Sequence, residues 1–112
     1  MDNELFILWT NDNIITTEKM VFMYARNALL KKWWGSVTLI IWGAPAKLVS
    51  DNNAIGEKLR ELIIQGVKVS ACKACADQLG VSEKLIKLGV EVKYWGEDLT
   101  SLIRERKNLI SV

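Results

Sequence analysis

The residues best suited to specific chemistry are the two cysteines of the chain, Cys72 and Cys75, which form a Cys-x-x-Cys motif. Cys72 directly follows an apolar segment typical of a buried strand, and a short helical segment begins close behind it. Unpaired N–H groups in the first turn of a helix, together with the nearby charge of Lys73, favour thiolate over thiol. A thiolate attacks sulfur atoms and binds metal ions. We therefore expect Cys72 to be the reactive residue.

Cys75 lies three residues after Cys72, which places it about one helical turn away and on a similar face. From there it can attack a sulfur atom bonded to Cys72, either to release that sulfur or to close a disulfide. The motif is also compatible with two small buried hydrophobic side chains. Its position between a strand and a helix favours the reactive interpretation.

The chain contains no histidine, which removes the usual general base and the commonest zinc ligand. A structural zinc site needs four ligands, so two thiols could hold zinc only if the site were shared between subunits. Neither the G-x-G-x-x-G nor the G-x-x-x-x-G-K-[ST] phosphate-binding motif occurs. None of the functions considered below requires a cofactor, and we predict none.

Four weaker candidates accompany the thiols. Asn11 and Asp12 could polarise a ligand, although a solvated turn is the favoured interpretation. The Gly43–Pro45 segment could approach a ligand with its backbone, but the end of a strand and the start of a helix explain it equally well. Lys73 either tunes the neighbouring thiol or is a solvated charge. Trp95 either covers the thiol or fills the core, and we favour the core.

The elements that must position these residues follow from the apolar pattern. Strands are predicted at 5–9, 37–42, 67–71 and 90–94, with 109–112 as a short fifth strand. Helices are predicted from 16 or 17 to 32, after Pro45, and over 54–65, 74–79, 82–89 and 97–107. Strands that alternate with helices predict a parallel sheet with helices on both faces.

In an open α/β sheet, ligands bind at the carboxyl ends of the strands. Four segments should gather at that edge, namely 10–13, 43–45, 72–75 and 95–96. Only one of these segments contains a good nucleophile. The expected site therefore centres on the Cys-x-x-Cys motif.

Composition limits the remaining possibilities. The chain of 112 residues fits a single domain, 1–112, and half of it is hydrophobic. Fifteen basic and thirteen acidic residues give a net charge of +2, which argues against nucleic-acid and membrane binding. The apolar runs are far shorter than the roughly 20 residues that span a bilayer. The acidic start, Met1–Glu4, does not resemble a secretory signal, so we expect a cytoplasmic location.

The chain also contains five tryptophans, many for its length. Most are expected in the core. Some could instead line a subunit interface, where aromatic side chains are enriched.

Read in order, these features resemble the DsrE/DsrF-like family of small sulfur-relay proteins, over nearly the whole chain. The resemblance is carried by the buried first strand, by a long helix ending at Trp33-Trp34-Gly35 and by VTLIIWGAPAKL at 37–48. Its strongest part is GVKVSACKACADQLGV at 66–81, which looks like the family's strand, cysteine, short helix and glycine.

This resemblance implies a three-layer α/β/α sandwich with a five-stranded, mainly parallel sheet. It also implies assembly of identical chains into trimers or hexamers. Cys72 aligns with the family cysteine at the end of the third strand. The resemblance therefore implies that Cys72 carries sulfur as a persulfide and passes it to a partner.

Three functions remain in view. The first is a sulfur carrier or sulfurtransferase, in which Cys72 takes sulfane sulfur from a donor protein and yields it to an acceptor thiol. Cys75 would assist release by forming a disulfide. The second is a non-enzymatic homo-oligomeric binding module, suggested by the tryptophans and by the wide apolar surface of the first helix. The third is a dithiol redox protein that uses a Cys72–Cys75 disulfide.

Overall fold

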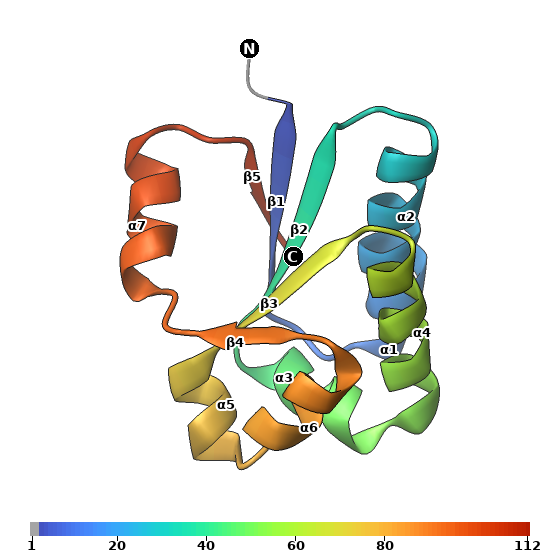
Figure 1. Ribbon diagram of the computed structural model, residues 1–112, viewed down its shortest axis with the longest axis vertical. Helices are drawn as coiled ribbons and strands as arrows, with labels where there is room; N and C mark the ends of the chain where they lie inside the picture. The colour runs from blue at the N-terminus through green and yellow to red at the C-terminus, as the bar shows by residue number, and fades with distance from the viewer. Residues whose placement is uncertain (1–2) are drawn as a thin grey trace.

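Five strands pair edge to edge in the order β4-β3-β2-β1-β5, and every neighbouring pair is parallel. This is seen in a computed structural model, which describes residues 3–112 (Figure 1). The strands are β1 (Glu4–Trp9), β2 (Ser36–Ile41), β3 (Lys68–Cys72), β4 (Glu91–Lys93) and β5 (Leu109–Ser111). The expected five-stranded sheet is thus confirmed, and it is parallel throughout.

The central strands β1 and β2 are the most apolar because both faces of the sheet are covered there. They pair over six positions, from Glu4 opposite Ser36 to Trp9 opposite Ile41. The edge strands β4 and β5 contain only three residues each. Short edges leave few unpaired backbone groups for unwanted pairing.

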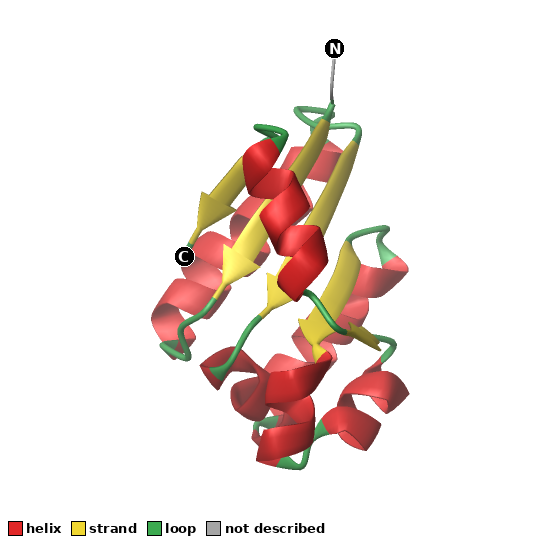
Figure 2. Ribbon diagram, turned by 90° about the vertical axis from the view of Figure 1, so that its left-hand side faces the viewer, coloured by secondary structure: helices red, strands yellow, loops and turns green. Residues whose placement is uncertain are grey.

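The helices form two unequal layers. Helix α7 lies alone in front of one face of the sheet, whereas α2 and α4 lie behind the other (Figure 2). Helices α3, α5 and α6 gather near the carboxyl ends of the strands (Figure 1). The bounds are α1 (Ile14–Thr16), η1 (Thr17–Phe22), α2 (Met23–Leu30), α3 (Ala44–Asp51), α4 (Asn53–Ile64), α5 (Lys73–Leu79), α6 (Ser82–Leu88) and α7 (Gly96–Arg104).

The first helical segment departs from the ordinary helix that the sequence predicts. Its middle part, η1, is π-helical, with one extra residue in each turn. The wider turn brings Thr17, Val21 and Phe22 into the core together. The segment ends at Leu30, before the predicted Lys32, because Lys32 adopts a left-handed backbone with φ of 59°.

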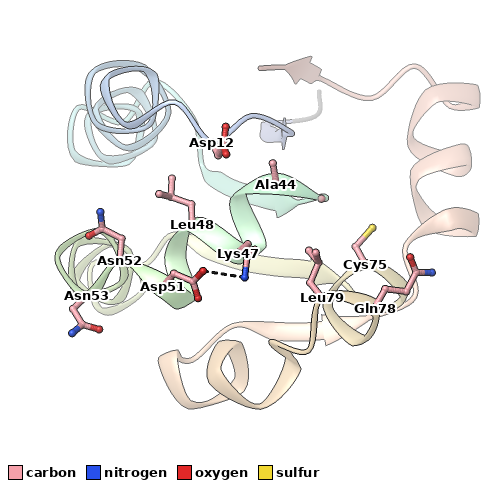
Figure 3. A pocket seen from close by; sticks show the side chains of 11 residues that line it. Asp12, Ala44, Lys47, Leu48, Asp51, Asn52, Asn53, Cys75, Gln78 and Leu79 are labelled. Carbon is pink, nitrogen blue, oxygen red and sulfur yellow. Dashed lines mark ion pairs between the residues drawn. The ribbon is translucent and has the colours of Figure 1, made fainter.

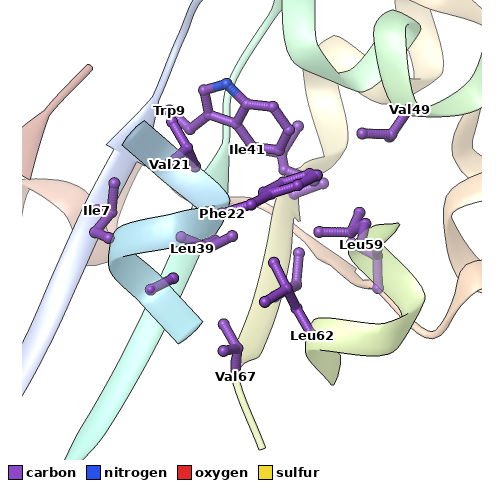
Figure 4. Packing of buried hydrophobic residues seen from close by; sticks show 14 of the residues in the cluster. Ile7, Trp9, Val21, Phe22, Leu39, Ile41, Val49, Leu59, Leu62 and Val67 are labelled. Carbon is purple, nitrogen blue, oxygen red and sulfur yellow. The ribbon is translucent and has the colours of Figure 1, made fainter. Parts of the chain in front are cut away.

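The larger core lies between the sheet and the helices α2 and α4. Trp9 and Phe22 meet edge to face in it, with ring centroids 5.4 Å apart, above Leu39 and Leu59 (Figure 4). A smaller cluster occupies the opposite face of the sheet. There Ile40, Cys72 and Trp95 pack against side chains of α7.

The tryptophans divide between these environments. Trp9 and Trp95 are buried, which confirms the core interpretation for them. Trp33, just after α2, is 52% exposed.

No helix within residues 3–112 is both long and apolar enough to cross a membrane.

Candidate functional site

A cleft of about 840 Å³ opens at the carboxyl edge of the sheet (Figure 3). Its walls come from the loop after β1, which carries Asp12, and from the turn after β2 at Gly43 and Ala44. Helix α3, the start of α4 and the face of α5 that carries Cys75 complete it. Three of the four segments expected to gather at this edge therefore do so.

The fourth expected segment does not line the cleft. Trp95 lies on the face of the sheet covered by α7, where it packs in the same cluster as Cys72. The reason is that the chain leaves β4 toward α7, which lies on the opposite face of the sheet from α2 and α4 (Figure 2). The loop after β4 thus approaches the thiols from the other side.

Cys72 is the last residue of β3 and the residue immediately before α5. The helix predicted over 74–79 is present and begins one residue earlier, at Lys73. The Cys72 residue is only 5% exposed, because it packs among Ile40 and Trp95. A buried position limits direct contact between this sulfur and a large reactant.

Cys75 occupies the first turn of α5, is partly exposed and lines the cleft. Both cysteines are free thiols, and they share a hydrogen bond. Burial raises the pKa of the Cys75 thiol above its usual range, and the neighbouring Cys72 raises it further. A hydrogen bond from the backbone N–H of Gly43 acts in the opposite direction. The predicted proximity of the two thiols is thus present in the structure.

Gly43 supplies that N–H because of its backbone conformation. Its φ of 82° and ψ of −124° lie in a region that side chains disfavour, and it directly precedes α3. A Cβ atom at this position would meet no other atom within 4 Å. Glycine is therefore required by the turn and not by crowding. The sequence suggested only a strand end here and did not reveal the contact with Cys75.

The charge of Lys73 is engaged locally. Its Nζ lies 2.6 Å from Oδ2 of Asp77, and this hydrogen bond raises the pKa of Lys73. The same contact lowers the pKa of Asp77, as does a 2.6 Å hydrogen bond from the hydroxyl of Ser82. Asp77 thereby ties α5 to the start of α6. These contacts hold in place the helix that carries Cys75.

Two consecutive hydrogen bonds fix the position of the Trp95 indole. Its Nε1 donates to Oγ of Ser70 at 2.7 Å, and that hydroxyl donates to Oε1 of Glu91 at 3.0 Å. Lys93 lies over the indole, with Nζ 4.4 Å from the ring centroid. Sequence reasoning did not predict these hydrogen bonds. Their only visible signal was Ser70, a polar residue on the strand that ends at Cys72.

Sequence reasoning also missed most of the cleft wall. Lys47 and Asp51 line it and form an ion pair at 3.1 Å across one turn of α3. This i,i+4 charge pattern is readable in the sequence, but it does not show which way the helix faces.

No group of three or more potential metal ligands is found within residues 3–112.

Comparison with known proteins places the chain. The sequence model of the DsrE/DsrF-like family matches residues 11–111. The structure superposes on a conserved protein of unknown function, BT1422, from Bacteroides thetaiotaomicron. That match has a TM-score of 0.96 and 34% identity, and it covers 98% of this chain and 95% of the other.

A more distant structure is a protein of unknown function, MTH1491, from Methanobacterium thermoautotrophicum. It has a TM-score of 0.75 and 18% identity, over 99% of this chain and all of the other. No curated protein matches the sequence significantly. Since the family match extends over nearly every residue and agrees with the fold, the chain belongs to the DsrE/DsrF-like family.

Proposed function

We propose that this protein is a sulfur carrier that holds sulfane sulfur as a persulfide on Cys72 and passes it to an acceptor thiol. The main support is the pair of free thiols in mutual contact, one buried and one facing a cleft, in a DsrE/DsrF-like chain. Persulfides are easily lost to reductants and oxidants. A storage sulfur at a 5% exposed position is shielded from both.

Loading is an exchange at sulfur. The Cys72 thiolate bonds to the outer sulfur of a donor persulfide, and the donor's own sulfur–sulfur bond breaks. The donor leaves as a thiolate and takes the proton that Cys72 gave up. An acceptor thiolate then attacks the outer sulfur of the Cys72 persulfide and removes it in the same manner, so no net oxidation occurs.

Cys75 provides a second exit. Its thiolate can attack the inner sulfur of the Cys72 persulfide, which forms a Cys72–Cys75 disulfide and releases hydrosulfide. An external thiol reductant must then restore the two thiols. The hydrogen bond between the cysteines supports this role, because it places them within reach of each other.

The carrier needs partners and a reducing compartment. We propose that identical chains assemble as trimers or hexamers and that a protein partner accepts the sulfur. Exposed apolar side chains at Met23, Leu30 and Trp33 support a contact between subunits. Thiols remain reduced in the cytoplasm, and we place the protein there.

The experiment is an intact-mass measurement on the reduced protein after incubation with a persulfide donor. We expect a gain of one sulfur, about 32 Da, that is retained in Cys75→Ser under non-reducing conditions. In Cys72→Ser no sulfur should remain after an excess of acceptor thiol has been added and removed. If Cys72→Ser stored sulfur as stably as the unmodified chain, the assignment of the carrier residue would be wrong.

The contact between the thiols also favours a second function, that of a dithiol redox protein. The same experiment separates the two. A redox protein would lose two hydrogens, about 2 Da, on mild oxidation and would gain no sulfur from the donor. A protein that gains one sulfur from the donor and loses two hydrogens with the oxidant would support a carrier that can also release its sulfur by forming the Cys72–Cys75 disulfide.

A further inference from the structure

Only one of the two thiols is in contact with the cleft. Cys75 is partly exposed and lines the cleft, whereas Cys72 is 5% exposed and does not (Figure 3). A sulfur donor that enters the cleft therefore meets Cys75 before it can reach Cys72. Cys75 also packs against the small cluster that contains Cys72, so the two sulfurs are close enough for the next transfer.

The size of the cleft indicates an organic donor. A volume of about 840 Å³ lies within the range of about 300–1,000 Å³ typical of small-molecule sites. The space therefore has room for an organic group as well as the donor sulfur. Apolar side chains from Ala44, Leu48 and Leu79 line it, and they suit a carbon chain attached to the donor sulfur.

The charge of the cleft indicates the sign of that donor. Three charged side chains line it, and two of them, Lys47 and Asp51, neutralise each other at 3.1 Å. Asp12 stands apart from this ion pair in the view of Figure 3. It is exposed and has no hydrogen-bonding or ionic partner within residues 3–112. One uncompensated carboxylate remains, which attracts cations and repels anions.

We propose that the cleft binds a small organic persulfide whose organic part is neutral or positively charged, and that Cys75 receives its outer sulfur and relays it to Cys72. This inference rests on the proposed function. It adds the class of donor, the receiving thiol and the residue, Asp12, that selects the charge.

The relay balances without an oxidant or a reductant. In the first step, the Cys75 thiolate bonds to the outer sulfur of the donor, and the donor leaves as a thiolate with the proton from Cys75. In the second step, the Cys72 thiolate bonds to that same sulfur, and Cys75 recovers its thiol with the proton from Cys72. The N–H of Gly43 stabilises the negative charge each time it appears on Cys75.

The first test uses three donors of matched size, the persulfides of cysteamine, 2-mercaptoethanol and mercaptoacetate, which carry a positive, a neutral and a negative group. Sulfur gain by the full chain is followed by intact mass over time. Cys75→Ser should load at least tenfold more slowly with every donor. Cys72→Ser should still take up sulfur transiently on Cys75.

Charge selection is tested by Asp12→Asn, with Glu105→Gln as the control. Glu105 is exposed at the end of α7, so both changes alter the net charge equally. Two unit charges about 7 Å apart in water attract or repel each other enough to change a rate about threefold. The cationic donor should load about threefold more slowly and the anionic donor about threefold faster in Asp12→Asn, so the ratio of their rates should fall about ninefold, and it should stay unchanged in Glu105→Gln.

A second test is independent of sulfur carriage. Aminoethyl and sulfonatoethyl methanethiosulfonate label thiols with a cationic or an anionic group, and peptide mass shows which cysteine reacts first. We expect Cys75 first, a preference for the cationic reagent relative to the unfolded chain, and loss of that preference in Asp12→Asn. First labelling at Cys72, or a preference insensitive to Asp12→Asn, overturns the inference.

The two tests separate failure of the inference from failure of the proposed function. If the chain loads sulfur and Cys75→Ser loads equally fast, the carrier stands and the relay is wrong. If no donor transfers sulfur although labelling follows the expected order and charge preference, the carrier function is wrong. The relay is then wrong as well, and only two conclusions are kept: Cys75 is the thiol that reacts first, and the cleft prefers cationic reagents.

Discussion

At the scale of single residues, the two cysteines are distinguished by what surrounds them. Cys72 packs among Ile40 and Trp95, while Cys75 faces both the cleft and the N–H of Gly43. The sequence could show that a thiol follows the third strand, because the apolar pattern and the helix start are local. It could not show which thiol is exposed, because that depends on α3 and α7, elements distant in the chain.

The raised pKa of Cys75 predicts an alkaline profile for its reactivity. Alkylation of Cys75 by iodoacetamide should rise with pH along a midpoint above the ordinary thiol value of about 8.5. Cys72→Ala should lower this midpoint, since the hydrogen bond and charge of Cys72 both raise the pKa, while burial still keeps it above the ordinary value. Rates measured by mass spectrometry check this, and an unchanged midpoint in Cys72→Ala would contradict it.

The same pKa shift is linked to stability, with a definite sign. The folded chain holds the Cys75 proton more tightly than the unfolded chain does. This contribution is therefore present below about pH 8.5 and is lost as the pH rises through the higher folded value. Urea unfolding across this range should show a smaller alkaline loss of stability in Cys75→Ser than in the unmodified chain.

Gly43 is predicted to be sensitive to a single methyl group. Gly43→Ala should lower the free energy of unfolding by about 1–3 kcal/mol, because the strain lies in the backbone conformation. It should also raise the pKa of Cys75 further if the N–H turns away. Gly96→Ala is the control, since a Cβ there meets no atom within 4 Å and φ is ordinary. Equal stability of the two variants would contradict the role of the Gly43 backbone.

At the scale of elements, the junction between α3 and α4 forms one wall of the cleft. Asn52 ends α3 and caps α4, with its side-chain oxygen accepting a 3.0 Å hydrogen bond from the N–H of Ile55. The sequence predicted α4 almost correctly, and Pro45 marked the start of α3. It gave no sign of the π-helical η1, whose side chains are placed by packing against Trp9 and Leu39 and not by a local pattern.

The cap at Asn52 carries a prediction of its own. Asn52→Ala should cost about 1 kcal/mol of stability, because the N–H of Ile55 loses its partner. Asn52→Asp should retain most of it, since a carboxylate caps equally well. Asn53→Ala serves as the neighbouring control at an exposed position. Thermal or urea unfolding measures the stability of all three variants. If Asn53→Ala lost as much stability as Asn52→Ala, the loss could not be attributed to the cap.

At the scale of the whole molecule, the exposed apolar side chains remain after the fold is complete. Met23 and Leu30 are seven residues apart and lie on one stripe of α2, with Trp33 just beyond its end. The fold class and the parallel sheet followed from the alternation of strands and helices. The cleft and the surface stripe did not, because both depend on the final direction of each helix.

This stripe supports a prediction about assembly. Sedimentation should give a mass of about 38 or 76 kDa, three or six times the 12.7 kDa chain. Leu30→Glu should reduce that mass while leaving the circular dichroism unchanged, because Leu30 is 69% exposed in the single chain. Ile64→Glu is the matched control, since Ile64 lies on α4 and is 78% exposed. A monomeric mass for the unmodified chain would remove the subunit contact from the proposal.

The packing of Trp95 beside Cys72 has a practical consequence. The indole is held by its hydrogen bond to Ser70, and it shares a cluster with the sulfur. Indole emission responds to nearby charge and to sulfur atoms that quench it. The proposed change from thiol to persulfide beside Trp95 should therefore alter the intrinsic fluorescence, and the difference spectrum against Trp95→Phe should isolate that signal. Trp95 would thereby serve as a built-in optical reporter, through which the proposed sulfur loading can be followed in real time without any attached dye.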